Sequence, residues 1–163
     1  MGLFDCIPTV ALMQRSELAA PRELIRRVLE EELRPDAAAS AEFFSVHASG
    51  MFYAQCYVGR VQYHIGVGRT PYPAEVSGQP PGEPESRLAW LRHEAWMYVD
   101  AVLYAVPDER DVHFANVMRL AGRFVDERCV LIWLHGPREQ PKRVALPTAE
   151  NVAALRAGRW PGL

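Results

Sequence analysis

The feature that most constrains the fold is a stretch, residues 42–69, in which apolar side chains recur at every second position. This period is typical of β-strands with one buried face, because successive side chains of a strand point to opposite sides. Turn residues interrupt the stretch at Ala48-Ser49-Gly50 and at Gly59-Arg60. The pattern therefore predicts a three-stranded antiparallel meander. Its buried face would carry Phe44, Val46, Phe52, Ala54, Cys56, Val58, Val61, Tyr63, Ile65 and Val67.

The turn lengths set the predicted register, since a slip of one residue would exchange the two faces of a strand. A two-residue turn at Gly59-Arg60 brings the apolar rows of the second and third strands onto one face. In the first hairpin, a three-residue loop at 48–50 places Val46 opposite Phe52. A two-residue turn would instead place His47 there, so we expect the three-residue loop.

The opposite face of the meander is polar and aromatic. It carries Ser45, His47, Met51, Tyr53, Gln55, Tyr57, Gln62 and His64. The register places Gln55 across from His64 and Tyr53 across from Gly66, where a ring can cover the missing side chain. Aromatic residues are enriched at the centres of protein interfaces. We therefore expect a binding face for a protein partner, or for a second copy of the chain. Its residues would be Tyr53, Gln55, Tyr57, His64 and His47. Coverage by the chain's own C-terminal helix is the alternative.

Apolar spacing also predicts the elements around the meander. Buried strands are expected at 7–13, 94–105 and 130–134, helices at 21–34, 114–125 and 148–157, and one or two helical turns at 86–92. Prolines and glycines predict an irregular loop at 69–86, and Pro137, Pro141 and Pro147 predict a second irregular connection. This order predicts a single α+β domain over residues 1–163. We expect a ferredoxin-like split β-α-β fold with an enlarged antiparallel sheet and its helices on one face.

Composition and spacing argue against several classes of partner. Eighteen basic and twenty acidic residues leave a formal net charge of -2, without a long run of either sign, so we expect no nucleic-acid partner. No apolar run reaches the ~20 residues that cross a bilayer, and no secretory signal is visible. We therefore expect a cytoplasmic protein without a membrane partner. The three cysteines form no C-x-x-C pair, and the five histidines lack metal-ligand spacing, so we expect no disulfide, metal or cofactor.

Asp100 and His93 are the residues that could carry catalysis. Asp100 lies in the middle of an apolar strand, where an unpaired carboxylate would be costly. An ion pair with an arginine is the favoured explanation, and a catalytic acid is the alternative. His93 opens that strand after the proline-rich loop, so His93 and Asp100 could form the acid/base pair of a small hydrolase-like enzyme. No G-x-S-x-G turn is present, and no complete catalytic set is visible, so binding is favoured over catalysis.

A tryptophan and a histidine-x-alanine step carry a resemblance to a known family. The residues are Trp90-Leu91-Arg92-His93-Glu94-Ala95, then Met97-Tyr98-Val99, after a loop that contains Pro71-Tyr72-Pro73. This stretch resembles an uncharacterised bacterial domain family of unknown function. The resemblance implies a compact bacterial α+β domain and transfers no site residue. The chain departs from the family in its Pro/Gly insert at 78–84 and its C-terminal helix. We expect a non-enzymatic interaction module, such as an immunity protein, an adaptor or a component of a defence or secretion system.

Overall fold

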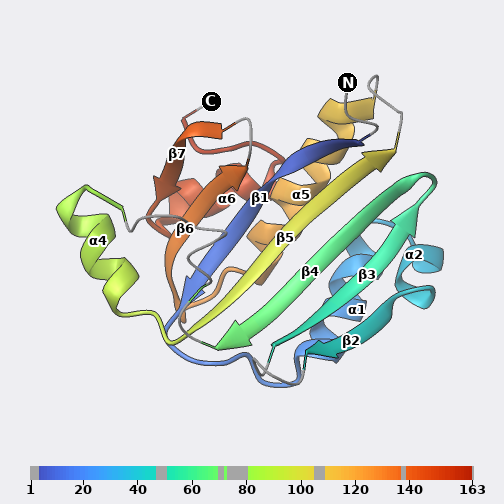
Figure 1. Cartoon of the computed structure of the whole chain (residues 1–163), viewed down its shortest axis with the longest axis horizontal. Coiled ribbons are helices and arrows are strands. Elements are labelled where there is room, and N and C mark those ends of the chain that lie inside the picture. Colours follow the sequence, from blue (N-terminus) through green and yellow to red (C-terminus); the bar gives the residue numbers. More distant parts are fainter. Residues whose placement is uncertain are drawn as a thin grey trace.

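A computed structural model describes residues 4–46, 51–69, 72, 81–104, 109–136 and 139–162. These residues form a mixed α/β structure around one open antiparallel sheet of seven strands, in the order β2-β3-β4-β5-β1-β6-β7 (Figure 1). The strands are β1 (Phe4–Gln14), β2 (Glu42–Val46), β3 (Met51–Val58), β4 (Val61–Arg69), β5 (Ala95–Tyr104), β6 (Cys129–Gly136) and β7 (Glu139–Ala145). The helices are α1 (Pro21–Glu32), α2 (Pro35–Ala39), α4 (Pro84–Leu91), α5 (Arg110–Phe124) and α6 (Ala149–Arg156).

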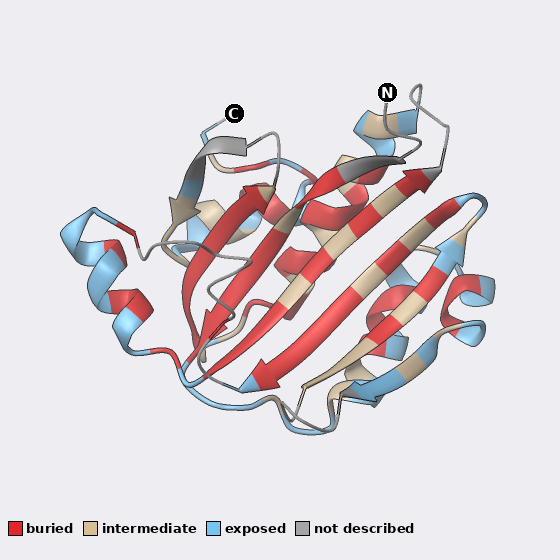
Figure 2. Cartoon of the chain, in the orientation of Figure 1, coloured by how far each residue is buried: buried red, intermediate tan, exposed pale blue. Residues whose placement is uncertain are grey.

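The main core lies between the sheet and the helices α1, α2, α5 and α6. Figure 2 shows the central strands buried along most of their length, whereas β2 carries exposed residues. Alternate residues of the strands supply the core, and α1 adds its buried side chains Ile25, Val28 and Leu29. Burying one such side chain fully contributes about 1.5–3 kcal/mol. The amphipathic pattern predicted for residues 21–34 is therefore confirmed, with Pro21 in the first helical turn.

The register of β3 against β4 is the one predicted. Val58 pairs with Val61, and Gly59 adopts the left-handed conformation that the two-residue turn requires, with φ at 61°. Gln55 lies across from His64, and Tyr53 lies across from Gly66. The ring that fills the space above Gly66 belongs to Tyr98 of β5, so the covering ring comes from the other neighbouring strand. Six of the ten residues predicted to be buried are buried, and Phe52 and Val58 are partly buried against the core. The six are Ala54, Cys56, Val61, Tyr63, Ile65 and Val67.

The predicted register of β2 is wrong by one residue. Val46 pairs with Met51, not with Phe52, and Phe44 pairs with Tyr53 on the polar face of the sheet. Phe43 therefore faces the core, where the guanidinium groups of Arg22 and Arg26 from α1 form cation–π contacts with its ring. Two adjacent phenylalanines supply an apolar side chain in either register, so the pattern could not separate the two. The loop predicted at 48–50 lies outside the described residues.

Three further predictions are corrected at the edges of the sheet. Residues 139–145 form β7, although Pro141 predicted an irregular connection there. Because β7 is an edge strand, the N–H that proline lacks is not needed by a second neighbour. Helix α4 begins at Pro84, inside the predicted loop at 69–86, most of which lies outside the described residues. Helix α4 also lies on the opposite face from the other helices, because Trp90 packs against Trp133 of β6.

The C-terminal helix forms as predicted but does not cover the polar face. Thr148 caps α6 by accepting a hydrogen bond from the backbone N–H of Asn151 at 3.2 Å. Leu155 is buried in the main core, and Arg156 donates to the backbone oxygen of Gly122 in α5. Helix α6 thus packs on α5, on the helix side of the sheet. This placement contradicts the alternative in which α6 shields the polar face.

Candidate functional site

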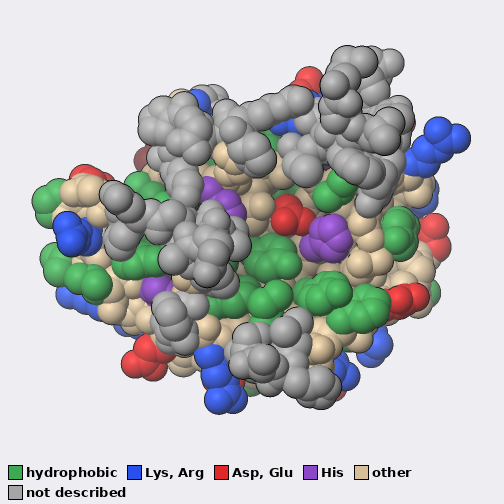
Figure 3. Space-filling view, viewed as in Figure 1, with side chains coloured by type: hydrophobic (Ala, Val, Ile, Leu, Met, Phe, Trp, Pro, Cys, Tyr) green, Lys and Arg blue, Asp and Glu red, His purple; other side chains and the backbone are tan. Residues whose placement is uncertain are grey.

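The polar sheet face remains the strongest candidate for a site. We call it the open face and define it by residues of β2, β3, β4 and β5 that point away from the main core. They are Phe44, Tyr53, Gln55, Tyr57, Gln62, His64, Tyr98 and Asp100. Figure 3 views the molecule from this side and shows hydrophobic, acidic and histidine side chains gathered on it. Within the described part of the chain, no helix covers this half of the sheet.

Asp100 is the centre of a hydrogen-bonded cluster on the open face. Its Oδ1 lies 2.9 Å from Nδ1 of His64, the residue directly across from it on β4. The hydroxyl of Thr9 on β1 donates to the other carboxylate oxygen, Oδ2, at 3.3 Å. The predicted ion pair between Asp100 and an arginine is therefore wrong, because His64 and Thr9 form the hydrogen bonds of this carboxylate. We call these three residues the Thr9–Asp100–His64 cluster.

A β-bulge in β1 brings Thr9 to the carboxylate. Ile7 pairs with Ala101 and Val10 pairs with Val99, so Pro8 and Thr9 together lie opposite the single residue Asp100. Proline is rare in a central strand because it cannot donate to the ladder, and a bulge is one of the few places that accommodate it. The sequence signal for this part of the site was therefore Pro8 inside an apolar strand. Thr9 was not among the site residues predicted from the sequence.

The hydrogen bond to Asp100 fixes the direction of the His64 imidazole. An ionised carboxylate only accepts hydrogen bonds, so Nδ1 of His64 carries the proton and Nε2 of the neutral ring carries a lone pair. Nε2 has no hydrogen-bond partner among the described residues. The side chains of His64 and Asp100 are 22% and 25% exposed. The cluster therefore presents an oriented proton acceptor to solvent.

Tyrosines and glutamines surround this acceptor. The hydroxyl of Tyr57 accepts hydrogen bonds from the side-chain amides of Gln55 at 3.1 Å and Gln62 at 2.9 Å. The ring of Tyr57 is 48% exposed. Phe44 and Tyr53 stack with their ring centroids 5.0 Å apart. Four of the five predicted binding residues, Tyr53, Gln55, Tyr57 and His64, thus share one face, whereas His47 lies outside the described residues.

Tyr98 adds a neutral phenol to the open face. Burial raises the pKa of Tyr98 to about 12, and the nearby charges of Asp100 and Tyr53 act in the same direction. The ring lies flat over β4 because Gly66 has no side chain. Its hydroxyl has no hydrogen-bond partner among the described residues. Near neutral pH this hydroxyl is therefore protonated and can donate a hydrogen bond.

His93 is held apart from Asp100, in a separate aromatic cluster. Its Nδ1 donates to the backbone oxygen of Trp90, and its Nε2 accepts from the backbone N–H of Tyr72 at 3.3 Å. Burial lowers the pKa of His93, and an Nε2 that accepts a hydrogen bond carries no proton. The hydroxyl of Tyr72 is bonded to Nε2 of His135 at 2.8 Å, and its ring packs edge-on against Trp96. The structure therefore gives His93 a local structural role and does not join it to Asp100.

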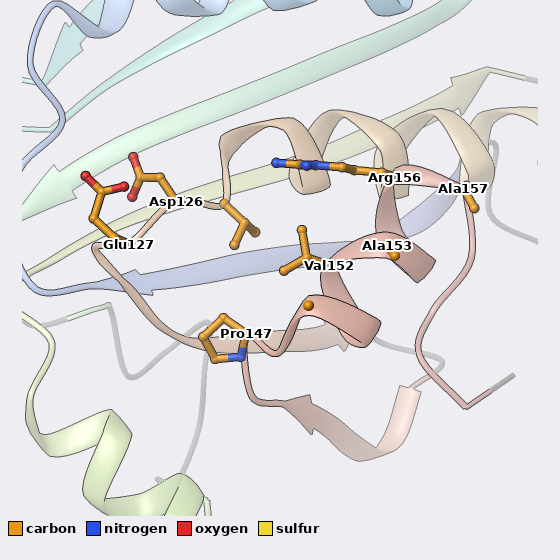
Figure 4. A pocket seen from close by; sticks show the side chains of 9 residues that line it. Asp126, Glu127, Pro147, Val152, Ala153, Arg156 and Ala157 are labelled. Atoms are coloured by element: carbon orange, nitrogen blue, oxygen red, sulfur yellow. The ribbon is translucent and has the colours of Figure 1, made fainter.

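Other parts of the described chain offer fewer chemical groups. No three or more His, Cys, Asp or Glu side chains of the described residues form a group that could hold a metal ion. No helix in the described ranges is long and apolar enough to cross a membrane. A groove beside α6 lies between Asp126 and Arg156 (Figure 4). Two of the charged groups that line it have local partners, since Asp126 pairs with Arg128 and Arg156 donates to the backbone oxygen of Gly122.

The sequence was also compared with known proteins. No family model matches the chain, and no curated protein matches its sequence.

Proposed function

We propose that the protein is a bacterial interaction module that binds a protein partner through the open face. The observation that carries this proposal is the exposure of aromatic rings on a sheet face that no described helix covers. Tyr57 is 48% exposed, although the other face of its strand β3 is buried at Ala54 and Cys56, and Phe44 on β2 is 36% exposed. Aromatic residues in this position provide a large contact area at a small cost in side-chain entropy.

The polar groups of the open face also favour binding, because several of them are already hydrogen-bonded before a partner arrives. The two glutamine amides fix the Tyr57 hydroxyl before any partner arrives, which lowers the entropy lost on association. The carboxylate of Asp100 is already bonded to His64 and Thr9. A partner that covers the face therefore buries a carboxylate whose two oxygens already accept hydrogen bonds, which lowers the cost of removing it from water.

The size of the open face also suits a protein interface. Neighbouring strands lie about 4.8 Å apart and rise about 3.3 Å per residue, so β2 to β5 cover about 19 Å by about 26 Å, or about 500 Å² of flat area. Side chains raise the accessible area above this value. A standard interface buries about 800 Å² per partner, so the flat face would supply more than half of one and a partner would also contact side chains at its rim.

The strand order supports a more specific description of the fold. The four neighbours β4, β5, β1 and β6, with α1 after β1 and α5 after β5, follow the order expected of a ferredoxin-like split β-α-β core. We propose that β2, β3 and β7 are additions to this core. A cytoplasmic location and the absence of a nucleic-acid partner also stay predictions.

Photocrosslinking from the two sides of the molecule tests the proposed function. A photoreactive amino acid at Tyr57 should capture a partner protein or a second copy of the chain. The same group at Val112, which is 59% exposed on α5, should not. In the purified complex, the pair Tyr53→Ser and Tyr57→Ser should weaken association by more than about 1 kcal/mol while the melting temperature barely changes.

The matched control is Val112→Ser, which should leave association intact. A large fall in melting temperature after the two tyrosine exchanges, with unchanged association, would assign these rings to stability alone. Equal capture from Tyr57 and Val112 would also contradict the proposal.

A further inference from the structure

We propose that the Thr9–Asp100–His64 cluster is an acid–base site, in which Nε2 of His64 activates a water molecule against an ester bound on the open face. This inference does not depend on the proposed protein partner. It concerns Nε2 of His64, which has no hydrogen-bond partner in the described part of the chain, and it is tested by a different experiment.

Asp100 and Thr9 hold the imidazole of His64 in one orientation. A general base must have its lone pair fixed toward the proton that it removes. Asp100 fixes the ring through Nδ1 at 2.9 Å, and Thr9 fixes the carboxylate through its second oxygen at 3.3 Å. When Nε2 takes up a proton, the positive charge forms beside the negative carboxylate, which stabilises it. The same logic underlies the aspartate–histidine pairs of hydrolases.

An ionisable side chain, a proline and a β-bulge meet at one point of the sheet, at Asp100 and the neighbouring part of β1. On the open face of β5, the two neighbours of Asp100 are Tyr98 and Val102, a half-buried aromatic and a half-buried apolar residue. An apolar side chain in place of Asp100 would be compatible with the strand and would avoid the desolvation cost of a carboxylate. Directly beside it, β1 contains Pro8 and a bulge. Exceptions to the local rules of folding concentrate at functional sites, and bulges often aim a side chain there.

Neutral hydrogen-bond donors lie on the same face of the sheet as His64. When water attacks an ester, negative charge develops on the carbonyl oxygen and needs a donor. Tyr98 is protonated near neutral pH, and its hydroxyl has no described partner. The Tyr57 oxygen accepts two amide hydrogen bonds, so its own proton is available to a ligand. The open face therefore supplies both an acceptor and donors.

The reaction balances without any further reactant. The water oxygen bonds to the acyl carbon while one of its protons passes to Nε2 of His64. The bond from the acyl carbon to the leaving oxygen then breaks, and Nε2 returns the proton to that oxygen. The products are a carboxylic acid and an alcohol. His64 is the catalytic residue, whereas Asp100 and Thr9 are positioning residues. Thr9 is not the nucleophile, because its proton is donated to Asp100.

Hydrolysis of p-nitrophenyl acetate by the full chain provides the test. We expect His64→Gln to remove the activity above background and Asp100→Asn to lower it by about 10²-fold or more, as general-base catalysis contributes about 10²–10⁴-fold. Thr9→Val should lower it by a smaller factor. The matched control carries Leu91→His in the His64→Gln protein. Leu91 is 68% exposed at the end of α4, so this variant measures an exposed imidazole without an orienting carboxylate.

Two outcomes would overturn the inference. One is a wild-type rate no greater than that of the Leu91→His control, and the other is an Asp100→Asn protein as active as the wild type. If Asp100→Asn does not fold, ¹⁵N NMR of the wild-type imidazole still decides. The proton of His64 must reside on Nδ1, and a proton on Nε2 of the neutral ring would refute the arrangement. The crosslinking test of the open face is unaffected by either result.

Discussion

A methyl group added to Gly66 should destabilise the protein through one aromatic ring. A Cβ built on Gly66 would lie 2.6 Å from Cδ1 of Tyr98 and would overlap two further ring atoms. The ring cannot move away freely, because it stacks on Trp96 with the centroids 6.0 Å apart, and Trp96 in turn fills the space above Gly68. Overpacking of this kind costs about 1–3 kcal/mol. We expect Gly66→Ala to lower the free energy of unfolding by that amount.

The cost should disappear when the ring is removed. In a Tyr98→Ala protein, Gly66→Ala meets no ring. In that background Gly66→Ala should raise the free energy of unfolding by about 0.4–1 kcal/mol, because alanine restricts the unfolded chain more than glycine does. The sign of the substitution thus reverses between the two backgrounds. Gly82→Ala is the matched control, since its Cβ would meet no atom within 4 Å, and it should cost little in either background.

Urea denaturation of the four proteins measures this double-mutant cycle. A Gly66→Ala protein as stable as the wild type would refute the close approach of the ring. An equal cost with and without Tyr98 would refute the assignment of the strain to this ring.

Four further predictions concern single groups. Tyr63→Phe should cost about 2–4 kcal/mol in urea denaturation, because its hydroxyl bonds a buried imidazole at 2.5 Å and a buried amide at 2.9 Å, and each would lose a partner. Thr148→Ala should cost about 1 kcal/mol through loss of the α6 cap, measured by thermal unfolding. Burial raises the pKa of the Cys56 and Cys129 thiols to about 12, so a disulfide reagent should modify them only after unfolding. Burial lowers the pKa of His93, so its contribution to stability is present above about pH 6.5 and is lost as the pH falls below that value. His93→Gln should flatten this acid limb.

The local parts of the fold could be predicted from the sequence, and the non-local parts could not. The β3–β4 hairpin was predictable because Gly59-Arg60 is a two-residue turn, which fixes the register of both strands. The register of β2 was not, because Phe43 and Phe44 fit either face. The pairing of β5 with β4 could not be predicted either, because no sequence pattern indicates which strands are neighbours in the sheet.

The candidate site shows the same division. His64 and Gln55 could be placed on one face from their alternation. The contact of His64 with Asp100 depends on a pairing between strands separated by a long connection, so spacing alone could not predict it. Thr9 required a third strand and a bulge. Catalytic partners on different strands are therefore missed wherever strand order is unknown, even when each residue is correctly assigned to a strand.

The two edges of the sheet differ in their capacity to extend it into another molecule. Edge β7 contains Pro141, which interrupts the row of N–H donors that an incoming strand would use. Edge β2 contains neither proline nor lysine, so it retains a complete row. A molecule with one pairing edge can join a second copy through a two-fold axis, after which both β2 edges are occupied. Growth by edge pairing then stops at two chains, so the same sheet that could form a closed pair is protected against fibrous polymers.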